Sequence, residues 1–171
     1  MQKATDLNPL SSDDWAYLSR AHGADGQNLQ ARSAAERALK LRPDSTRAQI
    51  ALGTSRLLEK RGLEARELFS KVDDPGWRLT GLAMAEHTLG DATRSKQNLD
   101  AAIIQSAKDS AFQIAEAYAW RGDKSKAIEW LQRAYRQRDG GMITLRYDPL
   151  LAAIREESQY KELLKQLRLP P

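Results

Sequence analysis

Large and small apolar residues recur in one register along most of this chain. A large apolar residue appears four times, at separations of 34, 30 and 32 residues, as Leu18, Leu52, Leu82 and Ile114. Four more columns follow at fixed distances downstream. One position after each large residue lies Ser19, Gly53, Ala83 or Ala115, and thirteen positions after it lies Ala31, Ala65, Ser95 or Ala127. Seventeen positions after it lies Ala35, Phe69, Leu99 or Leu131, and twenty positions after it lies Ala38, Val72, Ala102 or Ala134. Within each unit these residues fall largely three, four or seven apart, which is the spacing of one helix face. The pattern therefore predicts two amphipathic helices in each unit.

Short turn sequences separate the two helices of each unit. They are Asp25-Gly26, Arg61-Gly62, Gly90-Asp91 and Gly122-Asp123. Small residues at fixed places let two helix axes approach closely. A single helix pair cannot bury its apolar face, so neighbouring pairs must stack on one another.

These units resemble tetratricopeptide repeats over residues 12–138. The first unit carries the signature residues Trp15, Leu18, Ala31, Ala38 and Pro43. The fourth carries Ile114, Ala115, Tyr118, Gly122, Asp123, Ala127, Leu131 and Ala134. The resemblance implies an all-α fold, a right-handed superhelical solenoid of antiparallel helix pairs with a C-terminal helical cap.

The repeat boundaries predict one continuous domain. Its parts are the end of a truncated upstream repeat at 1–11, repeats at 12–45, 46–75, 76–107 and 108–139, and capping helices at 140–171. Ala4, Leu7 and Pro9 occupy the closing positions of a repeat, so we expect the array to continue upstream. In the cap, Gly140-Gly141 is expected to end the preceding helix and Pro149 to begin the next, with Asp148 as its N-cap.

The C-terminal part has a narrower resemblance. It rests on the segments Tyr118-Ala119-Trp120-Arg121-Gly122-Asp123, Glu129-Trp130-Leu131-Gln132-Arg133-Ala134-Tyr135, Arg138-Asp139-Gly140-Gly141, Asp148-Pro149-Leu150 and Leu169-Pro170. These look like the repeat arrays of bacterial signalling proteins, in which such arrays follow winged-helix, nucleotide-cyclase or Ser/Thr-kinase modules. The resemblance implies a sensory or docking domain whose output module lies elsewhere.

Composition and charge narrow the possible partners. The 27 Lys and Arg exceed the 23 Asp and Glu by only +4, and the excess is spread along the chain, so we do not expect this stretch to bind nucleic acid. No window approaches 18 consecutive apolar residues, so we predict no membrane span. The compartment stays open, with the cytoplasm favoured and the periplasm requiring an upstream membrane span.

No constellation of residues points to catalysis. Cys is absent, and His22 and His87 are 65 positions apart without a supporting cluster, so we predict no metal site and no cofactor. Phosphate-loop, dinucleotide-binding, zinc-protease and nucleophile-elbow motifs are also missing. We therefore predict that this chain is not an enzyme.

The resemblance also implies where a partner binds, because the first helix of each repeat lines the concave groove in this family. The positions carried over are Arg20, Arg47, Ile50, Thr54, Trp77, Thr80, Met84, His87, Phe112, Glu116 and Trp120. We expect Trp77, Phe112 and Trp120 to anchor a partner, since aromatic residues are enriched at interface centres, and Arg20 and Arg47 to pair with its acidic groups.

Three functions compete. The leading prediction is a non-catalytic scaffold that binds a peptide, helix or partner domain in the groove. A small-ligand sensor controlling an attached DNA-binding or cyclase module is the second, and a homodimer through the N-terminal end is the third. The groove itself is either accessible to solvent, filled by the predicted C-terminal cap or part of the core.

Overall fold

The helices of this protein pair along the chain. The structure is a computed structural model and describes residues 6–168. In chain order the helices are α2 (Ser12–Ala24), α3 (Asn28–Leu41), α4 (Thr46–Leu58), α5 (Gly62–Ser70), α6 (Pro75–Thr88), α7 (Ala92–Ser106), α8 (Ala111–Trp120), α9 (Lys124–Gln137), the 3₁₀ helices η1 (Gly140–Tyr147) and η2 (Pro149–Ile154), and α10 (Ser158–Gln166).

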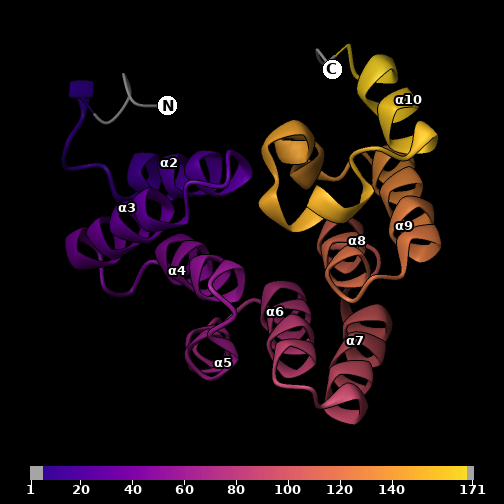
Figure 1. The fold of residues 1–171 in the computed structure, drawn as a ribbon, viewed down its shortest axis with the longest axis horizontal. Coiled ribbons are helices and arrows are strands. Elements are labelled where there is room, and N and C mark those ends of the chain that lie inside the picture. The colour runs from indigo at the N-terminus through magenta and orange to yellow at the C-terminus, as the bar shows by residue number, and fades with distance from the viewer. Residues whose placement is uncertain (1–5, 169–171) are drawn as a thin grey trace.

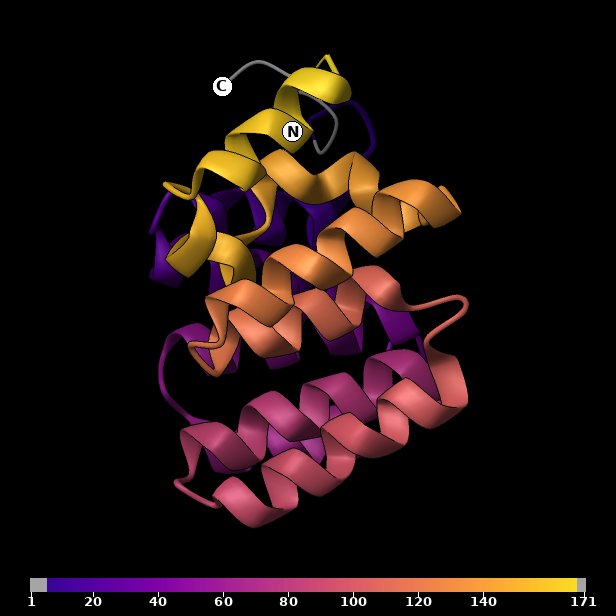
Figure 2. The ribbon, with the colours of Figure 1, turned by 90° about the vertical axis from the view of Figure 1, so that its right-hand side faces the viewer.

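Within residues 6–168, α2–α3, α4–α5, α6–α7 and α8–α9 form successive pairs, and each pair packs against the next. Figure 2 shows α6–α7 and α8–α9 stacked on one another. The predicted all-α solenoid of helix pairs is confirmed. Parts of two predicted segments lie outside the described residues: residues 1–5 of the truncated repeat at 1–11, and residues 169–171 of the cap at 140–171.

Short polar side chains start most of these helices. Ser11, Ser45 and Asp74 each accept a hydrogen bond from a backbone N–H in the first turn of α2, α4 and α6, at 3.1, 3.2 and 2.9 Å. Asp91 and Asp123 do the same for α7 and α9. A cap of this kind stabilises a helix by about 1 kcal/mol because it satisfies a donor that the helix cannot.

The columns of small residues lie where the two helices of a pair meet. Ala31, Ala65 and Ala127 are buried, and so is Ser95, the one polar member of the column. The Ser95 hydroxyl donates a 2.7 Å hydrogen bond to the backbone oxygen of Ala83 on α6. Ser95 therefore replaces alanine without leaving a buried polar group unpaired.

The turn inside the second repeat differs from its prediction. The left-handed residue of the other three turns is a glycine, Gly26, Gly90 or Gly122, whereas here it is Lys60, with φ of 60°. The predicted turn glycine, Gly62, instead begins α5 and lies against Leu89. A side chain in the left-handed region costs about 1–2 kcal/mol, so Lys60 occupies this position at a conformational penalty.

Phe69 of α5 fills the space between two neighbouring first helices. A Cβ atom added to Gly53 of α4 would lie 2.9 Å from the Phe69 ring, and one added to Gly81 of α6 would lie 2.1 Å from it. Both glycines are buried inside helices, where glycine is otherwise unfavourable. They are explained by the bulk of Phe69, which stands in a column that elsewhere holds alanine or leucine.

The segment after α9 turns back into the concave side of the solenoid. We call residues 140–154, which contain η1 and η2, the cap segment. Figure 1 shows it between α2 and α8, and it contacts both helices. Its residues Leu145, Leu150, Leu151 and Ile154 are fully buried in the main hydrophobic core. The cap segment is therefore part of the packed domain.

The start of the cap segment corrects one expectation. The residue that ends α9 in the left-handed conformation is Arg138, with φ of 56°, and not one of the two glycines. Gly141 has a different role, because a Cβ atom there would lie 2.5 Å from the ring of Phe112. Asp148 caps η2 as predicted, since its Oδ1 accepts a 2.9 Å hydrogen bond from the Leu150 N–H.

Gly81→Ala tests the close packing of Phe69. The new methyl group cannot fit unless Phe69 moves, so we expect the free energy of unfolding to fall by about 1–3 kcal/mol. Urea unfolding followed by circular dichroism measures the change. Gly140→Ala is the control, because its methyl group meets no heavy atom within 4 Å. Equal stability of the two variants would contradict the packing argument.

Candidate functional site

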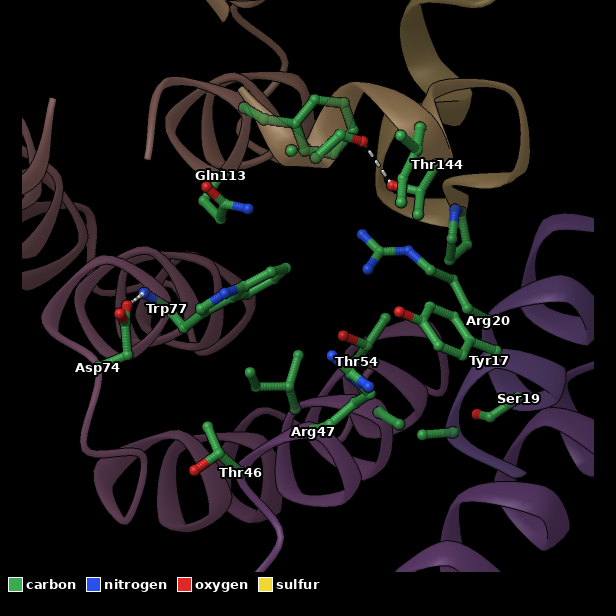
Figure 3. A pocket seen from close by; sticks show the side chains of 18 of the residues that line it. Tyr17, Ser19, Arg20, Thr46, Arg47, Thr54, Asp74, Trp77, Gln113 and Thr144 are labelled. Carbon is green, nitrogen blue, oxygen red and sulfur yellow. Dashed lines mark hydrogen bonds between the residues drawn. The ribbon is translucent and has the colours of Figure 1, made fainter. Parts of the chain in front are cut away.

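The first helices of the pairs and the cap segment surround a central cavity of about 520 Å³. We call it the central cavity. Its walls come from α2, α4 and the beginnings of α6 and α8, and η1 adds Gly140, Gly141, Ile143 and Thr144. Figure 3 shows side chains from these separate elements converging on one space. The walls thus combine residues far apart in the sequence.

Trp77 and Gln113 both line the central cavity. Figure 3 shows the indole of Trp77 and the side-chain amide of Gln113 pointing into the same space. Asp74 fixes the first turn of α6 by accepting a hydrogen bond from the Trp77 N–H. Gln113 is only 5% exposed, yet among the described residues nothing hydrogen-bonds to its amide. An amide that reaches the cavity without a partner in the chain is a group to which a ligand can hydrogen-bond.

Arg20 lies on the side of the cavity that faces the cap segment. One of its terminal nitrogens forms ion pairs with both Glu116 of α8 and Asp148 of the cap segment. The Arg20 side chain is 19% exposed, whereas both carboxylates are completely buried. We call these three residues the Arg20 cluster. It joins the first pair, the fourth pair and the cap segment in one interaction.

The Arg20 cluster contains one more carboxylate than it has cations. Burial and the charge of Asp148 raise the pKa of Glu116 well above its ordinary value, although the charge of Arg20 opposes this. Burial alone would lower the pKa of Arg20, but the two carboxylates outweigh it and raise that pKa. The raised pKa of Glu116 favours its neutral, protonated form, which balances the charge of the cluster.

Two further contacts fix the cap segment to α2. Arg155 donates hydrogen bonds to the backbone oxygens of Ala24, at 3.2 Å, and Asp148, at 3.0 Å. Pro149 packs so closely on Gly23 that an added Cβ atom would lie 3.3 Å from its ring. The contacts with Ala24 and Gly23 involve the second half of α2, so the cap segment closes the solenoid at that end.

The structure brings part of the predicted groove together. Six of the predicted positions line the central cavity: Arg20, Arg47, Ile50, Thr54, Trp77 and Phe112. Arg47 pairs with Asp13 at 2.6 Å and therefore already has an acidic neighbour within the chain. Phe112 is fully buried, and Gly141 of the cap segment lies against its ring.

The other five predicted positions do not line this cavity. Thr80, Met84 and Glu116 are buried, and the Thr80 hydroxyl donates to the backbone oxygen of Gly76 at 2.7 Å. His87 is exposed near the end of α6. Trp120 is partly buried at the end of α8, where its indole N–H donates to Thr88 Oγ1 at 3.0 Å.

The sequence predicted filling of the groove by the cap as one alternative, but it identified no cap residue as part of the site. Ile143 of η1 is 74% exposed, and together with Tyr17, Arg20 and Thr144 it lines both the central cavity and a second one of about 710 Å³. The second cavity also includes His22 and Tyr147. An exposed isoleucine is no signal in a sequence, because its exposure depends on how the cap segment folds.

Two chemical possibilities receive no support in the part of the chain that is described. No group of three or more His, Asp or Glu side chains is placed to hold a metal ion within residues 6–168. Over the same residues, no helix combines the length and the apolar character that crossing a membrane requires.

Stacked antiparallel helix pairs around a concave cavity define an α-helical repeat protein. The sequence profile of the tetratricopeptide repeat matches residues 18–78 and 80–141, and the chain therefore belongs to the tetratricopeptide repeat family. Among solved structures, it is similar to the crystal structure of YrrB, described as a TPR protein with an unusual peptide-binding site. The TM-score is 0.53 and the identity 17%, over 96% of this chain and 89% of that one.

Comparison with curated proteins gives no significant match. The family predicted from the repeat signature is thus confirmed. The resemblance of the C-terminal part to signalling proteins stays a prediction.

Arg20→Met tests whether the Arg20 cluster holds the domain together. It leaves two buried carboxylates without their cation, so we expect the free energy of unfolding to fall by about 3–5 kcal/mol. Arg47→Met is the matched control, because its ion pair with Asp13 is exposed and contributes about 1 kcal/mol or less. Similar losses for both variants in urea unfolding would be inconsistent with a structural role for the cluster.

Glu116→Gln tests the charge balance of the cluster. Because the folded-state pKa of Glu116 is raised, its stabilising contribution is complete below the unfolded pKa and is lost as pH rises through the folded pKa. Glutamine keeps the neutral state, so its stability relative to wild type should increase as the pH rises above 4.5, the ordinary pKa of a glutamate, toward the raised folded-state pKa. Urea unfolding across this range measures the difference. Glu129→Gln, at an exposed site, should show no such trend.

Proposed function

We propose that this chain is a protein-interaction scaffold that binds an extended peptide segment of a partner in the central cavity. The observation that carries the proposal is the pairing of Trp77 with Gln113. An aromatic ring and an amide without a partner in the described chain share one accessible space. Together they suit a peptide, whose side chain can pack on the indole and whose backbone can hydrogen-bond to the amide.

The shape of the site favours a peptide over a compact small molecule. The central cavity shares Tyr17, Arg20, Ile143 and Thr144 with the second cavity, so the two adjoin along η1. Adjoining cavities provide a path for an extended chain, whereas a small ligand is usually enclosed by one pocket. The family membership and the description of YrrB as a peptide-binding protein support the same interpretation.

Three finer predictions from the sequence are consistent with this proposal; the first two rest on the resemblance alone, and the third rests on the incomplete repeat at the N-terminal end. They are the role within a larger bacterial signalling protein, the control of an attached module and self-association through the N-terminal end. A scaffold of this kind serves each of them, and its binding step needs no catalytic group.

Trp77→Ala tests the proposal. Peptides selected from a random display library against the wild-type protein supply the probe, and fluorescence anisotropy measures their affinity. Removing the indole should weaken binding at least about tenfold, because buried tryptophans are typical binding hot spots.

Trp130→Ala is the matched control. Trp130 lies on α9, where it stacks on Arg133 at 4.7 Å and is also partly buried, but it does not line the cavity. Unchanged affinity of the Trp77 variant, or an equal loss in both variants, would show that the peptides bind elsewhere.

A further inference from the structure

A second surface lies where three of the first helices end. Lys60 follows α4, His87 is in the last turn of α6 and Arg121 follows α8. The first helices of successive pairs run in the same direction, so their C-terminal ends gather along one edge of the solenoid. None of these residues lines the central cavity or the second cavity.

Trp120 links the three helix ends. The Lys60 ammonium lies 4.4 Å from the centre of the Trp120 ring, a cation–π contact between α8 and the turn after α4. The Trp120 indole N–H donates to the hydroxyl of Thr88, the neighbour of His87. The indole is thus held in place, and one face of it supports Lys60.

The positive charge gathered here is not compensated. Among residues 6–168, no acidic side chain forms an ion pair with Lys60 or Arg121. In contrast, Arg61, which lies next to Lys60, pairs with Glu59 and Glu64. Partial burial lowers the pKa of His87, and the charges of Arg121 and Lys60 lower it further.

Lys60 also occupies its position against local preference. It is the left-handed residue of its turn, where the other three repeats have glycine. Helix dipoles attract cations to C-terminal ends, but that attraction requires neither a left-handed lysine nor convergence on one indole. Arg138 and Arg168 are also left-handed after their helices, so the conformation alone marks no site. The contact of Lys60 with the Trp120 indole, which is itself bonded to the neighbour of His87, distinguishes this turn from the others.

We propose that Lys60, His87 and Arg121 form a binding site for an oxyanion, either a carboxylate or a phosphate group of a partner, with Trp120 as its wall. All three side chains are hydrogen-bond donors when protonated, and charge-assisted hydrogen bonds to oxyanions are strong. The site is independent of the central cavity, so it gives the scaffold a second contact for the same or another partner.

Histidine NMR tests this proposal directly, because the chain has only two histidines and His22 is an internal reference. Sulfate is the probe, since it keeps its charge across the titration, and sodium chloride matches the ionic strength. A bound anion should raise the pKa of His87 by about one unit and leave that of His22 unchanged. By linkage, sulfate should bind more tightly at low pH, where His87 is protonated.

Lys60→Gln should raise the pKa of His87 without sulfate, because one repelling charge is removed, and should weaken the response to sulfate. Lys126→Gln is the matched control, because the Lys126 ammonium also lies over an aromatic ring, 5.3 Å from the centre of Tyr118. This substitution removes the same charge as Lys60→Gln. The control should preserve the full response of His87.

A peptide of four glutamates then distinguishes the two sources of oxyanion. A His87 response to both probes assigns a general oxyanion site that accepts carboxylates, and a response to sulfate alone assigns a site for phosphate-like groups. The proposal is overturned if neither probe moves the pKa of His87 beyond that of His22. An equal loss of response in Lys60→Gln and Lys126→Gln would overturn it as well.

Discussion

The ion pairs of Arg20 with Glu116 and Asp148 determine the form of this solenoid. They connect α2 with α8 and with the cap segment, across 96 and 128 residues of sequence. Two completely buried carboxylates are costly to remove from water, and the Arg20 guanidinium, which is paired with both of them, offsets much of that cost. The cap segment must therefore lie against α2, and the width of the concave side follows from this contact.

Closure by the cap segment changes what the repeats offer to a partner. In an open array, each first helix presents its concave residues along its whole length. Here Arg20 pairs with both Glu116 of α8 and Asp148 of the cap segment, and Gly141 of the cap segment lies against Phe112 of α8. The cap segment and Arg20 therefore cover much of the concave side of α8. The accessible surface shifts to Trp77, Gln113 and η1. A groove of repeated surfaces becomes a cavity whose walls come from different kinds of structure.

The helix pairs could be predicted from sequence because every repeat has the same spacing of apolar residues. The position of Trp77 on the concave side followed from that spacing. The sequence also predicted a C-terminal cap, but not its contacts, because the cap segment is not repeated and its contacts depend on the folded array. Arg20 illustrates the difference. Its position on the concave side was predictable, but the acidic groups that it pairs with, expected on a binding partner, are Glu116 and Asp148 of this chain. The turn at Lys60 was misassigned because Gly62 resembles a turn glycine by composition alone.

Residues that depart from the demands of the repeat are the best indicators of function in this fold. Lys60 takes a conformation that suits glycine, and Gln113 directs an amide into the cavity where no described residue hydrogen-bonds to it. The Lys60 conformation costs stability that a glycine would preserve. Parallel first helices place these departures at separate locations, one at the helix ends and one inside the cavity. The two proposed recognition surfaces therefore occupy different parts of the same regular scaffold.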